Sequence, residues 1–391
     1  MNKFTNSFKS LFRITRININ SFQPQVLFYY PQHFNQGADG TNDFLKPLID
    51  SCKKNNISFL VLEEPANNNA PRNKNAIPFD FVFYCIILLR KLLPLNNYPH
   101  FDAREWKIAR VLKPIFFRKI KPEVVITMSN SLLGFFRGLW KDTPIYDYQH
   151  GIIYSWHHGY MSDNKATSHI VNNNCKLLLY GEGFRKLMNK QNDHYYNKNC
   201  EVIGTTVEYK ELHKKFNGDI LLCLQITTAS ETFPLQGQLM QQLALLFQSN
   251  QSFYKENNIC FYIKHHPRFD GTYNIESILS FPFVKVINKP LPQCLEMCSV
   301  HMTYGSTTTF DAAVAGIPTL FFGKAEDNIL FEKEFQYPGF RESLEIQDRI
   351  EDFVKAPASY KDASLSVLSW VKNYYSPYNE IEFLKLVETK V

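Results

Sequence analysis

The sequence predicts an α/β protein made of two consecutive doubly wound domains, each built on a parallel sheet. Short apolar runs alternate with helical patterns along the chain, and polar or glycine-containing loops separate them. The alternation starts again after the polar segment 205–218, which contains several Lys, Glu and Thr residues. A length of 391 residues accommodates two or three domains, and 45% hydrophobic against 20% charged residues allows a sizeable core.

Each element follows from a local pattern. In the first half, apolar runs predict strands at 26–30, 57–62, 124–127, 145–148, 177–180 and 201–203. The segments between them predict helices at 42–54, 79–93, 103–119 and 131–140. In the second half, strands are expected at 220–224, 259–263, 284–287, 300–303 and 319–322. Helices are expected at 233–248 and 291–298, directly after the 300–303 strand, and beyond residue 360.

These elements predict five parts of the chain. A basic N-terminal segment covers 1–22 and the first domain covers 23–204. The linker 205–218 then leads into the second domain, 219–360. The C-terminal helices, 361–391, are expected to pack back on the first domain.

The charge balance is mildly basic, with 43 Lys and Arg residues against 37 Asp and Glu, a formal net charge of +6. The positive charge is not concentrated, so a nucleic-acid partner is not expected. It fits an anionic substrate or membrane surface, and equally a slightly basic soluble protein. The 8 Cys are scattered without a CxxC pair, which indicates small buried thiols in a reducing compartment.

The N-terminal segment contains no apolar core of a signal peptide. Basic and apolar residues alternate there without an acid, so at helical spacing the segment can lie on an anionic membrane. The alternative is a frayed basic tail. The apolar stretch 79–93 is interrupted by Asp80 and Arg90-Lys91 and is short for a membrane span. The expected location is cytoplasmic, with contact at the inner face of the membrane.

The strongest functional motif is the segment 304–318, YGSTTTFDAAVAGIP. A strand end, Gly305 and three hydroxyl residues precede an Ala-rich helix, where free N–H groups and the helix dipole attract a phosphate. The hydroxyl residues are Ser306, Thr307 and Thr308. Asp311 lies about one turn into the helix, where a carboxylate can accept hydrogen bonds from ribose hydroxyls. The alternative is an ordinary Ser/Thr helix cap without a ligand.

A second candidate follows the predicted strand 259–263 and reads Lys264-His265-His266-Pro267. Pro267 ends the strand and fixes the loop. His266 can donate a hydrogen bond to a phosphate or a leaving oxygen, and Lys264 can supply positive charge. A loop histidine is often without function, so this segment gains weight only beside the phosphate motif.

A third candidate follows the predicted strand 145–148. Its residues are Gln149, His150, Gly151, His157 and His158. A histidine at this strand end faces the expected cleft between the domains and can act as general base on an acceptor hydroxyl, because its pKa lies near neutrality. Glu182, between two glycines at the next strand end, is a second acid/base candidate; the alternative is an exposed loop acid.

A metal site is the alternative reading of the three histidines. No nearby carboxylate or Cys completes a recognisable ligand spacing, so no metal is predicted. The sequence also lacks the P-loop GxxxxGK[ST], a GxGxxG after the first strand, a GxSxG elbow and an Asp-x-Asp after a strand. P-loop chemistry and a metal held on a diphosphate are therefore not expected.

Taken together, the three segments resemble the GT-B class of glycosyltransferases. They are most similar to the bacterial group that makes capsule, teichoic-acid-like and lipopolysaccharide polymers. This group includes CDP-glycerol glycerophosphotransferases, Kdo-type capsule transferases and polysialyltransferases. The matching pieces are 149–151, 264–267, 305–308 with Phe310-Asp311, and Gly316-Ile317-Pro318. They span roughly residues 145–323, whereas the region before about 120 matches only in its α/β pattern.

The resemblance implies two Rossmann-like domains facing across a cleft, and it implies roles for single residues. His150 corresponds to the acceptor-side base of the family. His266, Ser306 and Thr307 correspond to residues that contact the donor phosphates. Asp311 occupies the position of an acid that holds the ribose in the related UDP-GlcNAc 2-epimerases. One departure, Thr308-Thr309 in place of an aromatic or apolar residue, argues against CDP-glycerol as the donor.

The resulting hypothesis is a metal-independent transferase without a cofactor. It would move a sugar or polyol phosphate from a nucleotide-activated donor to a glycan or lipid-linked acceptor. A 2-epimerase-like isomerase is one alternative, although paired acids are expected there and the helix start has a single Asp311. A non-catalytic nucleotide-sugar-binding assembly protein is the other.

Overall fold

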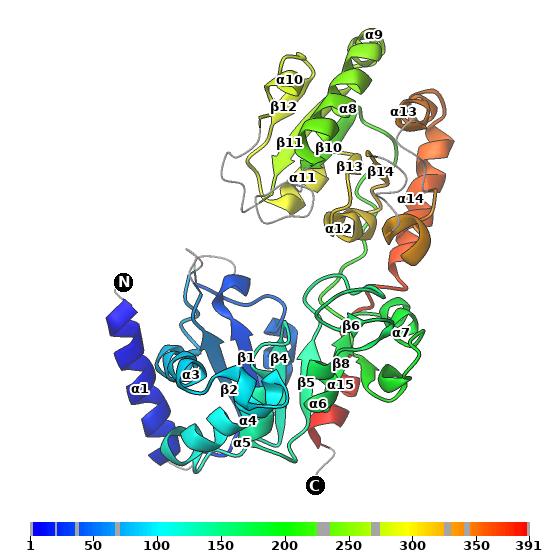
Figure 1. Cartoon of the computed structure of the whole chain (residues 1–391). Coiled ribbons are helices and arrows are strands. Elements are labelled where there is room, and N and C mark those ends of the chain that lie inside the picture. Colours follow the sequence, from blue (N-terminus) through cyan, green and yellow to red (C-terminus); the bar gives the residue numbers. More distant parts are fainter. Residues whose placement is uncertain are drawn as a thin grey trace. The chain divides into compact units, whose positions relative to one another are not determined.

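The computed structural model describes residues 3–19, 22–35, 39–66, 71–224, 235–266, 274–323, 330–339 and 345–388. The chain forms two compact units (Figure 1). The first contains Met1–Thr206 and Ser376–Val391, and the second contains Val207–Tyr375. No helix in these described ranges has the length and hydropathy needed to cross a membrane.

The first unit is built on a parallel sheet of seven strands in the order β3-β2-β1-β4-β5-β8-β9. The strands are β1 (Val26–Pro31), β2 (Phe59–Glu64), β3 (Ile77–Pro78), β4 (Val124–Met128), β5 (Ile145–Tyr148), β8 (Cys175–Leu179) and β9 (Cys200–Val202). All residues of β1, β4 and β5 are buried, as expected for parallel strands covered on both faces. A short hairpin, β6 (Met161–Ser162) and β7 (Lys165–Ala166), lies outside this sheet.

The predicted helices 42–54, 79–93, 103–119 and 131–140 are present in the first unit, and the structure adds further helices that were not predicted. The helices of this unit are α1 (Lys3–Ile19), η1 (Gln32–Phe34), α2 (Lys46–Lys54), α3 (Asp80–Leu92), η2 (Leu95–Asn97), α4 (Phe101–Leu112), η3 (Lys113–Phe117), α5 (Leu133–Leu139), α6 (Ser168–Asn172), α7 (Glu182–Met188), η4 (Tyr195–Asn197) and α15 (Glu380–Glu388). The predicted helix 103–119 is divided, because its last turn is the π-helix η3.

The second unit has a parallel sheet of five strands in the order β12-β11-β10-β13-β14. They are β10 (Asp219–Leu224), β11 (Cys260–His265), β12 (Val284–Val286), β13 (Val300–Thr303) and β14 (Thr319–Phe321). Its helices are α8 (Gln236–Ser249), α9 (Gln251–Glu256), α10 (Glu276–Leu279), α11 (Leu291–Met297), α12 (Thr308–Val314), η7 (Leu330–Glu334), α13 (Ile346–Lys355) and α14 (Pro357–Val371).

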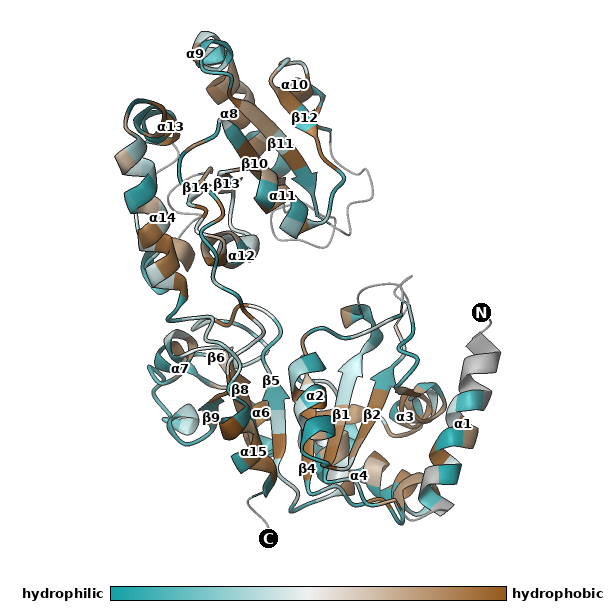
Figure 2. Cartoon of the chain, turned by 180° about the vertical axis from the view of Figure 1, so that it is seen from behind, coloured by the Kyte–Doolittle hydropathy of each residue, from teal (hydrophilic) through white to brown (hydrophobic). Residues whose placement is uncertain are grey.

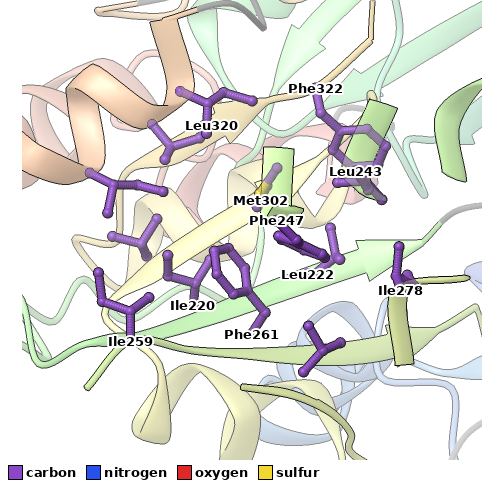
Figure 3. Packing of buried hydrophobic residues seen from close by; sticks show 14 of the residues in the cluster. Ile220, Leu222, Leu243, Phe247, Ile259, Phe261, Ile278, Met302, Leu320 and Phe322 are labelled. Atoms are coloured by element: carbon purple, nitrogen blue, oxygen red, sulfur yellow. The ribbon is translucent and has the colours of Figure 1, made fainter. Parts of the chain in front are cut away.

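A large hydrophobic cluster holds one face of the second sheet against its helices. Ile220 and Leu222 of β10 pack with Phe261 of β11 and with Phe247 of α8, and all four side chains are buried (Figure 3). The rings of Phe247 and Phe261 lie 4.6 Å apart. Burying a large apolar side chain in this way stabilises the folded state by about 1.5–3 kcal/mol. The cluster therefore holds in place the strand ends at which the candidate segments 264–266 and 304–308 begin.

The boundaries of the two units differ from the predicted ones. Residues from Val207 onward, expected as part of a linker, belong to the second unit, where Lys210 and Leu212 donate backbone hydrogen bonds to residues at the end of α12. Helix α14 also belongs to the second unit. Only the last part of the chain returns to the first unit, where Glu380 accepts a hydrogen bond of 2.7 Å from Lys54.

Helix α1 is an integral part of the first unit, so the alternative of a frayed tail is wrong for residues 3–19. Its Ser10 and Ile14 side chains are buried, and Ser10 Oγ accepts a hydrogen bond from the N–H of Phe81 at the start of α3. The buried face of α1 is thus occupied by protein contacts.

Candidate functional site

The candidate segments 264–266 and 304–308 lie at the ends of β11 and β13, the two neighbours of the central strand β10 in the second sheet. Cys223 of β10 pairs in register with Lys264 of β11 on one side and with Thr303 of β13 on the other. Neighbouring strands lie about 4.8 Å apart, so the backbones of Lys264 and Thr303 are about 10 Å apart. The chain order reverses at β10, and ligands of doubly wound sheets bind beyond the strand ends at such a point.

The loop 304–307 after β13 presents unpaired backbone donors. Within the described chain, the N–H groups of Gly305, Ser306 and Thr307 have no hydrogen-bond acceptor. A Cβ at Gly305 would meet no atom within 4 Å, so open space borders this loop. Three successive free N–H groups beside open space suit an anion such as a phosphate.

The hydroxyl groups next to this loop have different partners. Ser306 is buried, and its Oγ accepts a hydrogen bond of 3.2 Å from the N–H of Thr308. Thr308 Oγ1 lies 3.0 Å from Nε2 of His301, whose Nδ1 lies 2.9 Å from Oγ1 of Thr319. Burial lowers the pKa of His301 to about 3, so the ring is neutral, with one nitrogen donating and the other accepting. Ser306 Oγ is therefore bonded to the first N–H of α12, and His301 fixes the Thr308 side chain.

Lys264, His266 and Asp311, the other candidate residues of the second unit, differ in their contacts and exposure. Lys264 Nζ donates to the backbone oxygen of Lys289 at 2.6 Å, which holds the ammonium at the end of β11. His266 is partly buried two residues beyond Lys264, and Pro267 lies outside the described residues. Asp311 is in the first turn of α12 and is exposed as a residue, whereas desolvation of its carboxyl by the surrounding protein raises the pKa of that carboxyl to about 7.

Gln149 is placed differently from a substrate-contacting residue. Its side chain is buried, with Nε2 donating to the backbone oxygen of Gly151 at 2.6 Å and Oε1 accepting from the N–H of Tyr180 at 2.9 Å. Both ends of the amide thus tie the β5 loop to the end of β8. Gln149 holds His150 and Gly151 in position, and a Cβ at Gly151 would meet no atom within 4 Å.

His150 lies in an aromatic and histidine-rich environment at the ends of β1 and β5. The Phe34 ring contacts the His150 ring at 4.9 Å and the His33 ring at 4.2 Å. Burial lowers the pKa of His150 to about 4, and His157 and His33 nearby act in the same direction. Its Nδ1 is buried without a hydrogen-bond partner among the described residues. His150 is therefore a neutral imidazole at pH 7, the form in which histidine accepts a proton.

A buried carboxylate fixes the loop that carries these histidines. Asp147 of β5 accepts hydrogen bonds from Thr127 Oγ1 and Tyr160 OH, both 2.8 Å, and from the N–H of Asn130 at 2.9 Å. Burial raises the pKa of Asp147 to about 6. The hydrogen bond from Tyr160 anchors the far end of the irregular segment 150–160.

The other predicted residues of the first unit lie around this loop. The N–H of Gly159 donates to His157 Nδ1 at 3.2 Å, and the His157 ring contacts Tyr160 at 5.1 Å. His158 is exposed. Glu182 begins α7, and its Oε1 accepts a hydrogen bond of 2.9 Å from Arg185 Nη2.

The structure adds ionisable residues that the sequence did not single out. Glu64, at the end of β2, accepts hydrogen bonds from Tyr29 OH at 2.6 Å and Ser131 Oγ at 2.5 Å, and burial raises its pKa. Its only sequence signal is an acid that ends an apolar run.

A second addition is a His–Asp pair. His169 Nδ1 lies 2.6 Å from Oδ1 of buried Asp102. Burial works against protonation of His169, but the Asp102 hydrogen bond and charge outweigh it and raise the pKa. The two residues are 67 positions apart, so no local motif could reveal the pair.

No group of three or more His, Cys, Asp or Glu side chains in the described part of the chain has the geometry of a metal site. The polar groups described at the ends of β5, β11 and β13 are backbone N–H groups, hydroxyls, imidazoles and one lysine.

The fold with these strand-end loops defines the class to which the chain belongs structurally: it has the GT-B fold, with two Rossmann-like domains. The sequence itself matches no protein-family model and no curated protein. The likeness is therefore one of architecture, found by comparison with solved structures.

Three of these structures illustrate the likeness. UDP-GlcNAc 2-epimerase from Neisseria meningitidis, bound to UDP-GlcNAc, has a TM-score of 0.54 and 11% identity over 94% of this chain and 99% of its own. Glycosyltransferase SnogD from Streptomyces nogalater has a TM-score of 0.51 and 12% identity, with the same coverages. The lipopolysaccharide outer core galactosyltransferase WaaB has a TM-score of 0.52 and 10% identity over 95% and 100%.

Proposed function

We propose that this chain is a glycosyltransferase that takes a sugar or polyol phosphate from a nucleotide-activated donor. The acceptor would be a glycan or lipid-linked molecule in the synthesis of a capsule- or lipopolysaccharide-type polysaccharide. The observation that carries the proposal is the loop 304–307, whose three N–H groups have no acceptor among the residues that the structure describes, with open space at the switch point of the second sheet. The comparisons support a sugar-nucleotide ligand, because the structures of this fold include a glycosyltransferase and, separately, an epimerase that is bound to UDP-GlcNAc.

On the donor side, the N–H groups of Gly305, Ser306 and Thr307 would bind the phosphate that leaves with the nucleotide. Lys264 and His266 lie at the end of β11, on the other side of β10 from this loop. His266 would donate a hydrogen bond to the phosphate, and Lys264 would add positive charge. Preorganised donors of this kind stabilise charge that develops on a leaving oxygen. In this proposal no metal is required, and Asp311 accepts hydrogen bonds from the ribose.

On the acceptor side, His150 would remove the proton of the acceptor hydroxyl as its oxygen attacks the donor sugar. The ring is neutral at pH 7 and can accept a proton, although burial lowers its pKa below the near-neutral value expected from the sequence and makes it a weaker base than an ordinary histidine. Gln149 would act as a positioning residue through its bonds to Gly151 and Tyr180. Glu182 remains a second acid/base candidate, with His157 and His158 on the acceptor side.

A nucleotide thermal-shift screen tests the donor site. CMP, CDP, UDP and GDP are each added to the full chain, and a ligand that binds the native state raises Tm. We expect a shift with at least one of the four. No shift with any of them at millimolar concentration would overturn the proposal that the second unit binds a nucleotide-activated donor.

Gly305→Ala tests whether the open space at the loop serves the ligand. The added methyl meets no protein atom, so Tm without nucleotide should stay within about 1 °C, whereas nucleotide affinity should fall at least about tenfold. Gly237→Ala is the matched control, because a Cβ there also meets no atom within 4 Å. Equal affinities of both variants would show that the phosphate does not approach Gly305.

A 2-epimerase is the second candidate, because two such epimerases have TM-scores of 0.54 and 0.52 against 0.51 and 0.52 for the transferases SnogD and WaaB. The reactions are distinguishable in D₂O. Inverting a carbon that bears hydrogen removes that hydrogen, so an epimerase incorporates deuterium into the sugar without an acceptor. We expect no deuterium at C2 of UDP-GlcNAc by NMR; incorporation would favour the epimerase.

A further inference from the structure

One flank of the first unit exposes an unusual amount of apolar surface. Half of the sixteen large hydrophobic side chains exposed in the described residues lie on α1, α3, η2, α4 and η3. The most exposed are Phe12 at 67%, Leu92 at 65%, Ile115 at 58% and Leu88 at 56%. We call the exposed face of these five elements the helical flank. Clustered exposed apolar side chains mark interaction surfaces, whereas isolated ones do not.

The elements of the helical flank are neighbours in the structure. Helix α1 packs on α3, as Figures 1 and 2 show from opposite sides, and also on η3. The side-chain amide of Asn18, near the end of α1, donates to the backbone oxygen of Ile115 in η3. The rings of Phe81 in α3 and Phe116 in η3 lie 5.9 Å apart. Elements from three separate parts of the sequence therefore lie side by side in the first unit.

This surface carries positive charge without exposed acids. Helix α1 contains no acidic residue. The segment 80–119 contains three, Asp80, Asp102 and Glu105, and each is no more than 3% exposed. Exposed basic residues accompany the apolar ones, namely Lys9, Arg16, Lys91, Lys107 and Arg110.

We infer that the helical flank binds an anionic membrane surface. Lys and Arg contact lipid phosphates while Leu and Phe side chains enter the interface, which is the combination found in peripheral membrane helices. On α3 the apolar positions Tyr84, Leu88 and Leu92 recur every four residues and form one stripe. On α1, Ser10 and Ile14 are buried against the protein, while Phe12 is exposed together with the basic residues Lys9 and Arg16.

The inference does not rest on transferase activity, since every residue it uses lies outside the two strand-end sites. Vesicle co-sedimentation of the full chain tests it directly. Vesicles of phosphatidylcholine with 30% phosphatidylglycerol, roughly the anionic content at which basic segments bind, are compared with pure phosphatidylcholine. Binding is expected only to the anionic vesicles and should weaken as salt is raised from 0.05 to about 0.5 M.

Two double variants separate the contributions of charge and apolar area. Arg16→Glu with Lys91→Glu should lower the partition coefficient at least about tenfold, since each basic residue near an anionic surface contributes roughly a fivefold factor. Leu88→Gln with Leu92→Gln should lower it by a similar factor with little change in Tm. The controls on the second unit, Lys361→Glu and Leu245→Gln, also change exposed residues and should bind as the unaltered chain does.

Two results would overturn the inference. One is equal binding of the flank variants and the controls, or no binding to anionic vesicles. The other is absence of vesicle binding together with a change of oligomeric state: the unaltered chain is dimeric by light scattering, and the Leu88→Gln, Leu92→Gln variant is monomeric. That second result would assign the flank to contact between copies of the chain.

Discussion

His150→Ala is expected to lower sugar transfer by roughly 10²–10⁴-fold, the usual contribution of a general base. The nucleotide-induced rise in Tm should remain, because His150 belongs to the first unit and the donor loop to the second. The fold should also tolerate the change, since His150 Nδ1 has no hydrogen-bond partner in the described chain and burial disfavours its charged form. Transfer is measured as acceptor-dependent release of the nucleotide.

The pH dependence identifies the base. A histidine base is active when neutral, and burial lowers the pKa of His150 to about 4. Activity limited by His150 therefore stays constant as the pH falls from 7 to about 5 and declines only near pH 4. The pKa of His169 is shifted in the opposite direction, because Asp102 raises it above the ordinary 6.5. If His169 were the base, kcat/KM would begin to decline before the falling pH reached 6.5.

His194→Asn is the control for both experiments. His194 is an exposed histidine of the same unit with a φ of 53°, which asparagine adopts readily, so transfer and its pH profile should not change. Loss of nucleotide binding together with transfer in His150→Ala would contradict the assignment and indicate a structural role. Loss of transfer in His169→Ala but not in His150→Ala would move the base to the His169–Asp102 pair.

The sequence predicted the strands and most helices because each long element has a strong local signal. The apolar runs at 26–30, 124–127 and 220–224 lie in strands that are buried almost throughout. What it missed has weak local signals. Strand β3 has two residues and exists because Ile77 pairs in register with Leu62 of β2. The ends of the domains also depend on long-range contacts, such as the backbone bond from the N–H of Thr205 to the oxygen of Ser376.

The candidate site shows the same division between local and long-range information. The strand pattern predicts that His150, Lys264 and Gly305 lie at strand ends, because the carboxyl ends of the parallel strands in each sheet share one edge of that sheet. The hydrogen-bond partners do not follow from it. Gln149 has the local signature of a site residue, yet its amide is used by backbone groups of Gly151 and Tyr180.

Phe310→Ala is expected to destabilise the second unit by about 3–5 kcal/mol, the usual cost of removing a fully buried phenylalanine. Phe310 is completely buried in α12, and its ring lies 4.9 Å from Trp370 and 5.2 Å from Tyr375, with which it is stacked. Alanine leaves a cavity among these large rigid rings, which cannot collapse easily. For a unit of this size the Tm should fall by on the order of 10 °C.

The same substitution connects packing with ligand binding. Helix α12 begins directly after the loop 304–307, so a loosened anchor at Phe310 disturbs the N–H groups proposed to bind phosphate. At temperatures where it is still folded, Phe310→Ala should therefore bind nucleotide more weakly than the unaltered chain. Leu245→Ala is the control, because it truncates a side chain on α8 that is 56% exposed. This control should change the free energy of unfolding by less than about 0.5 kcal/mol and leave nucleotide binding intact. A folded Phe310→Ala protein with full nucleotide affinity would show that α12 does not position this loop.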